Sequence, residues 1–132
     1  MRALVIQDDA VLSRMIARHL SAEGFEVIES DIGDEGIQFA HTYILDIILV
    51  DDNLPDMSGF EFLRRLRRFD AKTPAVFCSC AVMDPDIAAK AHACGAQRLL
   101  LFPLCLSVLA GVVGDLVPAM RGFGPYDPQA RA

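Results

Sequence analysis

Residues 47–59 have the sequence IILVDDNLPDMSG, in which four apolar residues end abruptly at two acids and a segment containing proline and glycine follows. A short apolar run bounded by turn residues is typical of a buried strand in a parallel sheet. Open α/β sheets bind their ligands outside the carboxyl ends of the strands. The pattern therefore predicts that Asp51 lies at a surface cleft, where its carboxylate is available for chemistry.

A second acidic pair, Asp8 and Asp9, directly follows residue 7 at the end of another apolar run, residues 3–6. Two strands that end in carboxylates predict one acidic pocket, in which like charges repel one another unless a cation intervenes. Oxygen ligands without histidine or cysteine favour Mg²⁺. A carboxylate beside Mg²⁺ can act as a nucleophile toward phosphorus and form an aspartyl-phosphate. The structural alternative for this set is a solvated loop rim.

Strand and helix patterns alternate along the whole chain. Strands are expected at 2–6, 25–30, 46–50, 75–79 and 98–101, and helices at 11–22, from about 34, from 58, from 84 to 95, and at 104–119. This alternation predicts an α/β fold, a five-stranded parallel sheet with helices on both faces. One domain is expected over residues 1–119, followed by a flexible tail or linker start at 120–132, which is rich in Gly, Pro and Ala.

Capping residues support several of these helices. Gly24 is expected to end the first helix. Ser58 and Glu61 have the spacing of a capping box at the start of the third. Asp84 followed by Pro85 predicts an N-cap with proline at the first helical position of the fourth.

Composition limits the function classes. The chain has 132 residues, of which 53% are hydrophobic, and a net charge of −6, which argues against nucleic acid binding by this chain alone. The basic run at residues 64–68 is interpreted as a solvated helix face or a partner patch. The apolar stretch at 99–114 is shorter than a membrane span and contains Pro103. Four cysteines in apolar surroundings, with no signal-like segment before the first strand, predict reduced thiols and a cytoplasmic location.

Ser79 ends the fourth predicted strand at the same edge of the sheet as the acids. Its hydroxyl is suited to donate a hydrogen bond to a phosphoryl oxygen, and a strand-end cap is the structural alternative.

Four sequence features occur together in this chain. They are an acidic pair after the first strand, Asp-x-x-x-Pro-x-x-x-Gly after the third, Ser after the fourth and Gly-Ala before the fifth. In these features, residues 1–118 resemble the receiver domain of bacterial two-component response regulators. The stretches 6–9 and 53–59 look most like receivers of CtrA-type cell-cycle regulators.

The resemblance implies a flavodoxin-like (βα)5 fold and a role for each matching residue. Asp51 matches the phospho-acceptor, and Ser79 matches the switch hydroxyl. Asp8 matches the direct Mg²⁺ ligand, and Asn53 matches the position whose backbone carbonyl completes the metal site. Asp9 is expected to supply supporting charge. Asp52 is expected only as a rim residue.

The chain departs from the family pattern at four positions. Phe102 stands where the family has the lysine that contacts the phosphoryl group. The family's acidic pair matches positions 7 and 8 of this chain, and Gln7 replaces the first of its two acids. Cys80 replaces a small residue after the switch hydroxyl, and Leu99 replaces the switch aromatic. Gln7 removes a negative charge and Phe102 a positive one, so the net charge of the pocket is unchanged. The resemblance also implies a cis bond between Phe102 and Pro103.

These departures favour an atypical receiver that acts through protein–protein contacts, with reduced or absent phosphorylation at Asp51. Residues 104–116 carry more apolar side chains than one inward stripe needs, which predicts a homodimer or a docked partner on the face of the fourth helix, fifth strand and fifth helix. The alternative is a working receiver that accepts phosphate from a histidine kinase or phosphotransfer protein on Asp51 with Mg²⁺. A hydrolase is disfavoured because no nucleophile–base pair or glycine-rich loop accompanies the acids.

Overall fold

The computed structural model describes residues 1–79, 85–101 and 106–117, with backbone only at 106 and 107. Five strands form one parallel sheet: β1 (Arg2–Ile6), β2 (Glu26–Ser30), β3 (Ile47–Asp51), β4 (Ala75–Ser79) and β5 (Arg98–Leu101). Their spatial order is β2-β1-β3-β4-β5. The five helices are α1 (Ala10–Ala22), α2 (Gly33–Thr42), α3 (Gly59–Arg67), α4 (Ile87–Ala93) and α5 (Leu106–Leu116). The predicted fold class is confirmed.

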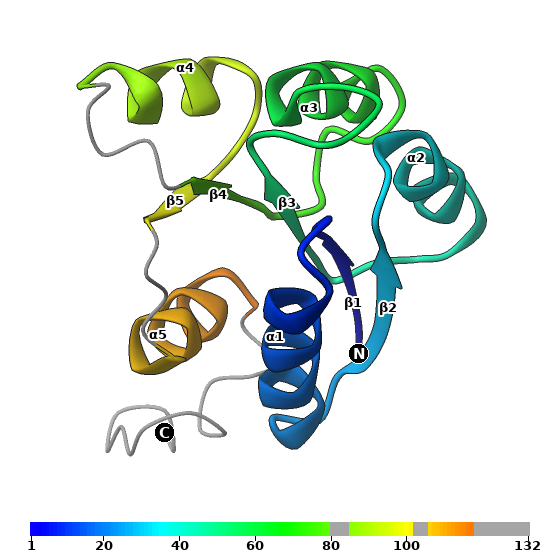
Figure 1. Ribbon diagram of the computed structural model, residues 1–132, viewed down its shortest axis with the longest axis vertical. Helices are drawn as coiled ribbons and strands as arrows, with labels where there is room; N and C mark the ends of the chain where they lie inside the picture. The colour runs from blue at the N-terminus through cyan, green and yellow to red at the C-terminus, as the bar shows by residue number, and fades with distance from the viewer. Residues whose placement is uncertain (80–84, 102–105, 118–132) are drawn as a thin grey trace.

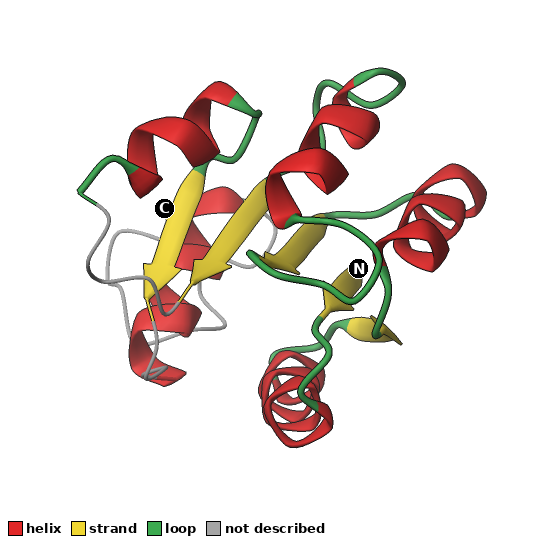
Figure 2. Cartoon of the chain, turned by 45° about the horizontal axis from the view of Figure 1, so that its top comes forward, coloured by secondary structure: helices red, strands yellow, loops and turns green. Residues whose placement is uncertain are grey.

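The helices cover both faces of the sheet, as Figures 1 and 2 show. One core lies between the sheet and helices α1 and α5, where Ile16, Leu20, Leu109 and Val113 are buried. The other core lies beneath α2, α3 and α4 and is centred on Phe62 and side chains of the same strands. Strand side chains alternate between these two cores, because successive residues of a strand point to opposite faces.

Most predicted boundaries agree with the structure to within a residue, and the differences have local causes. Strand β2 begins at Glu26 instead of Phe25, because the Phe25 N–H donates to the Leu20 carbonyl and takes part in ending α1. Gly24 has a φ of +99°, so the prediction that it ends α1 is confirmed. Strand β3 begins at Ile47, since Asp46 turns its carboxylate back to the backbone N–H of Arg2.

The predicted start of the fourth helix is wrong. Helix α4 begins at Ile87 with Asp86 as its N-cap residue, and Pro85 lies in a turn before it instead of at the first helical position. Asp86 has a φ of −98° and a ψ of 1°, so the chain enters the helix only after this residue. The proposed cap Asp84, the ends of the predicted fifth helix, and the expected tail at 120–132 lie outside the described residues.

No helix within the described residues combines the length and the apolar content that crossing a bilayer requires.

Candidate functional site

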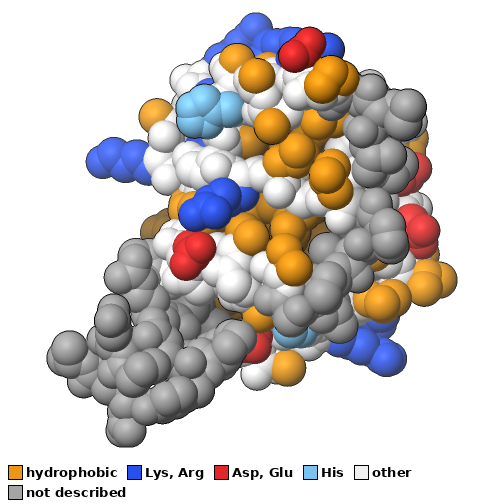
Figure 3. All heavy atoms as spheres, turned by 90° about the vertical axis from the view of Figure 1, so that its left-hand side faces the viewer, with side chains coloured by type: hydrophobic (Ala, Val, Ile, Leu, Met, Phe, Trp, Pro, Cys, Tyr) orange, Lys and Arg blue, Asp and Glu red, His pale blue; other side chains and the backbone are white. Residues whose placement is uncertain are grey.

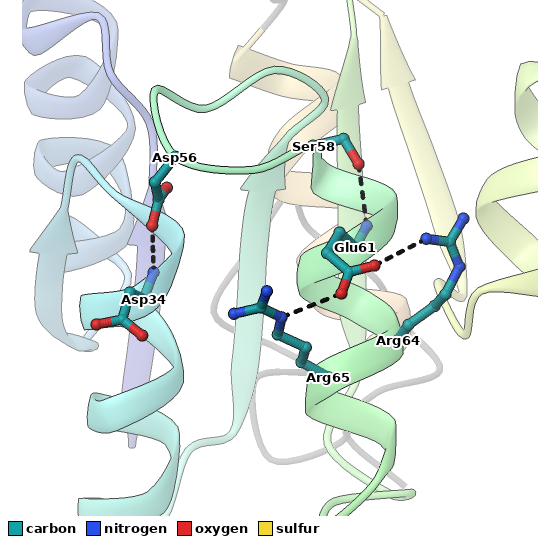
Figure 4. Close-up of polar contacts among 6 residues, drawn as sticks. All are labelled: Asp34, Asp56, Ser58, Glu61, Arg64 and Arg65. Atoms are coloured by element: carbon teal, nitrogen blue, oxygen red, sulfur yellow. Dashed lines mark hydrogen bonds and ion pairs between the residues drawn. The ribbon is translucent and has the colours of Figure 1, made fainter.

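The loop between β3 and α3 is tied down at two residues near the start of α3. Asp56 accepts hydrogen bonds from the backbone N–H groups of Gly33 and Asp34 at the start of α2, at 2.8 and 2.9 Å. Ser58 accepts from the Glu61 N–H at the start of α3, which confirms the serine half of the predicted capping box. Figure 4 shows the contact of Asp56 with Asp34 and that of Ser58 with Glu61. The loop that follows Asp51 is therefore a fixed frame.

The acidic side chain of Asp56 is held in its charged form by this frame. Burial opposes its ionisation, but the N–H groups of Asp34 and Gly33 outweigh that effect and lower the pKa of Asp56. Glu61, the other half of the predicted capping box, lies with Arg64 and Arg65 at 3.0 and 3.1 Å (Figure 4). Two members of the basic run are thus paired within their own helix.

Gly59 lets the first turn of α3 approach the end of β3. A Cβ atom at this position would lie 2.3 Å from the Asp51 carbonyl oxygen and 2.7 Å from the Phe77 ring. The Gly59 N–H also donates to the Asp52 carbonyl at 2.8 Å. This contact fixes the backbone that carries both acids and explains why the glycine of the motif stands where it does.

Asp51 ends β3 and is half-buried at the carboxyl edge of the sheet. Burial, and then the neighbouring charges of Asp52 and Asp8, raise the pKa of Asp51 to about 6. A cation that neutralises the charges of Asp52 and Asp8 would favour the ionised form of Asp51. The arrangement is the one expected where a divalent cation binds or where a carboxylate reacts.

Gln7 follows β1 directly and is almost fully buried, with 5% of its surface exposed. Its side-chain oxygen accepts from the Asp9 N–H at 3.1 Å. Hydrogen bonding from the Gln7 side chain slightly offsets the rise in the pKa of Asp51 that burial and the neighbouring charges cause. The residue that departs from the family's acidic pair is therefore a neutral donor to Asp51.

The structure separates the roles of the two acids after β1. Asp8 is exposed at the edge of the pocket, and its charge acts on Asp51. Asp9 accepts from the N–H groups of Val11 and Leu12, at 3.0 and 3.1 Å, and is the N-cap of α1. A helix cap is the role that sequence reasoning did not give to Asp9, although aspartate just before a helix is a common cap.

A metal site of at least three His, Cys, Asp or Glu side chains is absent from the part of the chain that the structure describes. The smaller set implied by the resemblance consists of two carboxylates, Asp8 and Asp51, and the backbone carbonyl of Asn53. Mg²⁺ characteristically takes one or two carboxylates and keeps several waters. The oxygen-only donor set and the unfavourable charge around Asp51 fit that ion.

Ser79 is fully buried at the end of β4 and donates to the Asp52 carboxylate at 2.6 Å. Sequence reasoning placed Asp52 only at the rim and missed this contact. The signal lay in the sheet register, in which Asp51 pairs with Cys78 and the next residue of each strand brings Asp52 beside Ser79.

Cys78 is a free, buried thiol beside these acids. Burial, followed by the charges of Asp51 and Asp52, raises the pKa of Cys78 far above the usual range, as expected for an inert buried cysteine.

The remaining predicted positions lie partly within and partly outside the described residues. Leu99, at the position of the switch aromatic, is half-buried against the core beneath α4. Cys80, Phe102 and the Phe102–Pro103 bond lie outside the described residues.

Solved structures with this fold include several receiver domains. A two-component response regulator from Clostridium difficile superposes with a TM-score of 0.85 at 20% identity, covering 92% of this chain and 98% of that one. The receiver domain of a sensor histidine kinase from Pseudomonas aeruginosa, solved with a magnesium ion coordinated in its active-site cleft, gives a TM-score of 0.81 at 20% identity, with 89% and 97% coverage. At this identity the likeness shows the fold alone.

Sequence comparison identifies the family. The cell cycle response regulator CtrA of Brucella ovis is 48% identical over 79 residues, which are 60% of this chain and 34% of that protein. The matched segment thus spans about a third of the length of the curated relatives. The model of the response regulator receiver domain matches residues 3–112. The chain belongs to the receiver domain family of two-component response regulators.

Proposed function

We propose that this chain is an atypical receiver that acts through protein–protein contacts, with phosphorylation at Asp51 reduced or absent. The observation that carries the proposal is the apolar surface on the side formed by α4, β5 and α5, called here the α4–β5–α5 face. Receiver domains are generally signalling domains that interact with kinases, phosphotransfer proteins or other regulators, and we propose no hydrolase activity.

The α4–β5–α5 face exposes large apolar side chains from two elements. Leu101 at the end of β5 has 45% of its surface exposed, and Val108 on α5 has 53%. Figure 3 shows hydrophobic side chains gathered across this side of the molecule. Leu109 and Val113 supply the inward stripe of α5, so Val108 is not needed for the core. Exposed apolar side chains on neighbouring elements are typical of a contact surface.

An ion pair links two elements of this face. Arg98 on β5 and Asp115 on α5 lie 3.4 Å apart. A hollow of about 160 Å³ between α4 and β5 is lined by residues that include Ala88, His92 and Leu99. Protein interfaces commonly combine exposed apolar side chains with polar groups beside them.

The sequence supports reduced phosphorylation. Phe102 stands in the place of the family's lysine and cannot donate a hydrogen bond or carry charge. The loss of one charge-assisted contact to a phosphoryl group costs a few kcal/mol, or about a hundredfold or more in rate.

A working phospho-receiver is the second candidate, and the pair Asp8 and Asp51 favours it. These carboxylates, with the Asn53 carbonyl, would hold Mg²⁺, which supplies the charge that a phosphoryl group on Asp51 needs. The exposed surface of α1 would then serve a kinase or phosphotransfer protein. Val11 and Met15 are exposed there, with Arg14 and Arg18 beside them.

Oligomeric state and partner binding test the main proposal. We expect the protein to self-associate at high micromolar concentration, or to bind a partner, and Val108→Glu to abolish that contact. Ile44→Glu is the matched control, because Ile44 is 88% exposed and lies outside this face. A protein that stays monomeric and recovers no partner, or equal loss in both variants, contradicts the proposal.

Binding of beryllofluoride, a phosphoryl mimic, decides between the two candidates. A Mg²⁺-dependent complex that Asp51→Asn abolishes supports the working receiver. An absence of binding in the wild type supports the atypical one.

A further inference from the structure

Asp52 and Ser79 are neighbours across β3 and β4. Asp51 lies opposite Cys78 in the parallel register, and the Asp52 N–H extends the ladder by donating to the Cys78 carbonyl at 2.9 Å. Successive side chains of a strand alternate between its faces. Asp52 therefore emerges on the opposite face from Asp51 and on the same face as Ser79.

The contact between them is short and partly enclosed. Ser79 has no exposed surface, and its hydroxyl donates to the Asp52 carboxylate at 2.6 Å. A hydroxyl–carboxylate bond of this length is charge-assisted and about twice as strong as a neutral one. It joins the end of β4 to the start of the loop that follows β3.

The end of β4 is in turn connected to the α4–β5–α5 face. Ser79 lies opposite Leu101 in the register of β4 and β5, and Leu101, like Val108, is a large apolar side chain exposed on that face. A change in the position of Ser79 would therefore also shift Leu101, on the surface proposed for partner contacts.

We propose that Asp52 is a built-in acceptor for the Ser79 hydroxyl, which takes the place of a phosphoryl oxygen and holds the end of β4 in one arrangement whatever the state of Asp51. The inference rests on the proposed function, in which Ser79 is the switch hydroxyl and the α4–β5–α5 face is the contact surface. It assigns to Asp52 a positioning role beyond that of a rim residue. Phosphorylation of Asp51, where it occurs, should then change the position of Ser79 and the end of β4 very little.

The hydrogen bond is tested first without any ligand. Amide hydrogen exchange at residues 75–79 is measured in the wild type, Asp52→Ala, Ser79→Ala and the double variant. We expect exchange about tenfold faster in each single variant and no further increase in the double variant, because both remove the same bond. Asp31→Asn, which removes an equal charge beside Asp8, is the control and should change exchange less than about twofold. Equal exchange in Asp52→Ala and Asp31→Asn overturns the proposal.

The consequence is then tested with Mg²⁺ and beryllofluoride, whose binding is followed by fluorine NMR. In the wild type we expect exchange at residues 98–101 to change less than about twofold on binding, and in Asp52→Ala to slow about fivefold, since the carboxylate that competes with the mimic for the Ser79 hydroxyl is then removed. A wild-type response as large as that of Asp52→Ala overturns the proposal. Absence of a bound fluorine signal in both proteins contradicts the phospho-receiver alternative only, and the ligand-free exchange then decides the role of Asp52. Asp52→Asn, which keeps an acceptor oxygen, should behave like the wild type in both measurements.

Discussion

On the β1–β3 side of the cleft, backbone groups and carboxylates of neighbouring loops hold one another. Asp56 binds the start of α2, Gly59 packs against the Asp51 carbonyl, and Asp9 caps α1. On the β4–β5 side, side chains of one element bind groups of another element. The Asp52–Ser79 bond fixes the end of β4, and Arg67 reaches from α3 to the carbonyl that precedes β5. The first side carries Asp8, Asp51 and Gly59 of the family motifs and departs from them at Gln7, whereas the second keeps Ser79 and has Leu99 in place of the switch aromatic.

We infer from this difference that the acceptor side and the proposed contact side of this receiver depend on different residues. The frame around Asp51 depends on backbone N–H groups of α2 and α3 that are bound by Asp56 and Ser58. The proposed contact side depends on a few side-chain pairs, such as Asp52 with Ser79. A change on one side can therefore leave the other side intact.

The largest effect is expected at Gly59, where the acceptor side is tightest. Gly59→Ala places a Cβ within 2.3 Å of the Asp51 carbonyl, so we expect a loss of about 3 kcal/mol or more in the free energy of unfolding. Urea denaturation measures this loss. Gly111→Ala is the control, because nothing lies near its Cβ in α5 and a gain of up to about 1 kcal/mol is expected. A Gly59→Ala protein as stable as the wild type would show that the loop is free to move.

Arg67 anchors the β4–β5 side, and its removal should have the next largest effect. Its guanidinium donates to the Gly95 carbonyl at 3.1 and 2.7 Å and to the Asp70 carbonyl at 3.0 Å. We expect Arg67→Met to lower the free energy of unfolding by about 2 kcal/mol, since it leaves partly buried carbonyls without a charged donor. Arg64→Met, which removes only an exposed ion pair, should cost less than about 0.5 kcal/mol. Equal losses would mean that Arg67 is not an anchor.

Asp51 gives a smaller effect with a defined pH dependence. Its pKa is about 6 in the folded protein against 3.8 for an unperturbed carboxyl, so the folded state holds this proton to higher pH than the unfolded state. Stability should therefore fall as pH rises from about 4 to about 6 and level off above that. Asp51→Asn should remove this fall and raise stability by about 1 kcal/mol at about pH 7, after discounting for solvent exposure. Urea denaturation of the wild type and Asp51→Asn at about pH 4 and about pH 7 tests the predicted difference in stability. A variant that is less stable than the wild type at about pH 7 would contradict the prediction.

The smallest expected effect concerns Asp9. Asp9→Ala removes the cap of α1 and should cost about 0.5 kcal/mol in stability, the low end for a cap, because Asp9 is exposed. If Asp9 acts only as a cap, the affinity for Mg²⁺, measured by titration calorimetry, should be unchanged. A drop of about tenfold in that affinity would restore the role in metal binding that the sequence suggested.

The sequence predicted the order and type of every described element, because apolar runs, caps and glycines are local signals. It also placed Asp8, Asp51 and Ser79 at one edge, since parallel strands end together. It missed the Asp52–Ser79 bond, because the register that sets Asp51 beside Cys78 depends on how whole strands pack. It could not separate Arg67 from the neighbouring arginines, because the carbonyl that Arg67 contacts lies 28 residues away in sequence.

The most direct test of the central claim compares the wild type with Asp51→Asn in the presence of Mg²⁺ and acetyl phosphate. Intact mass reports a phosphoryl group on Asp51, and light scattering on the same samples reports the oligomeric state. The account predicts little or no phosphoryl adduct and the same oligomeric state in both proteins. A stable adduct on the wild type alone, accompanied by a change in oligomeric state, would contradict it and make this chain a working phosphorylation switch.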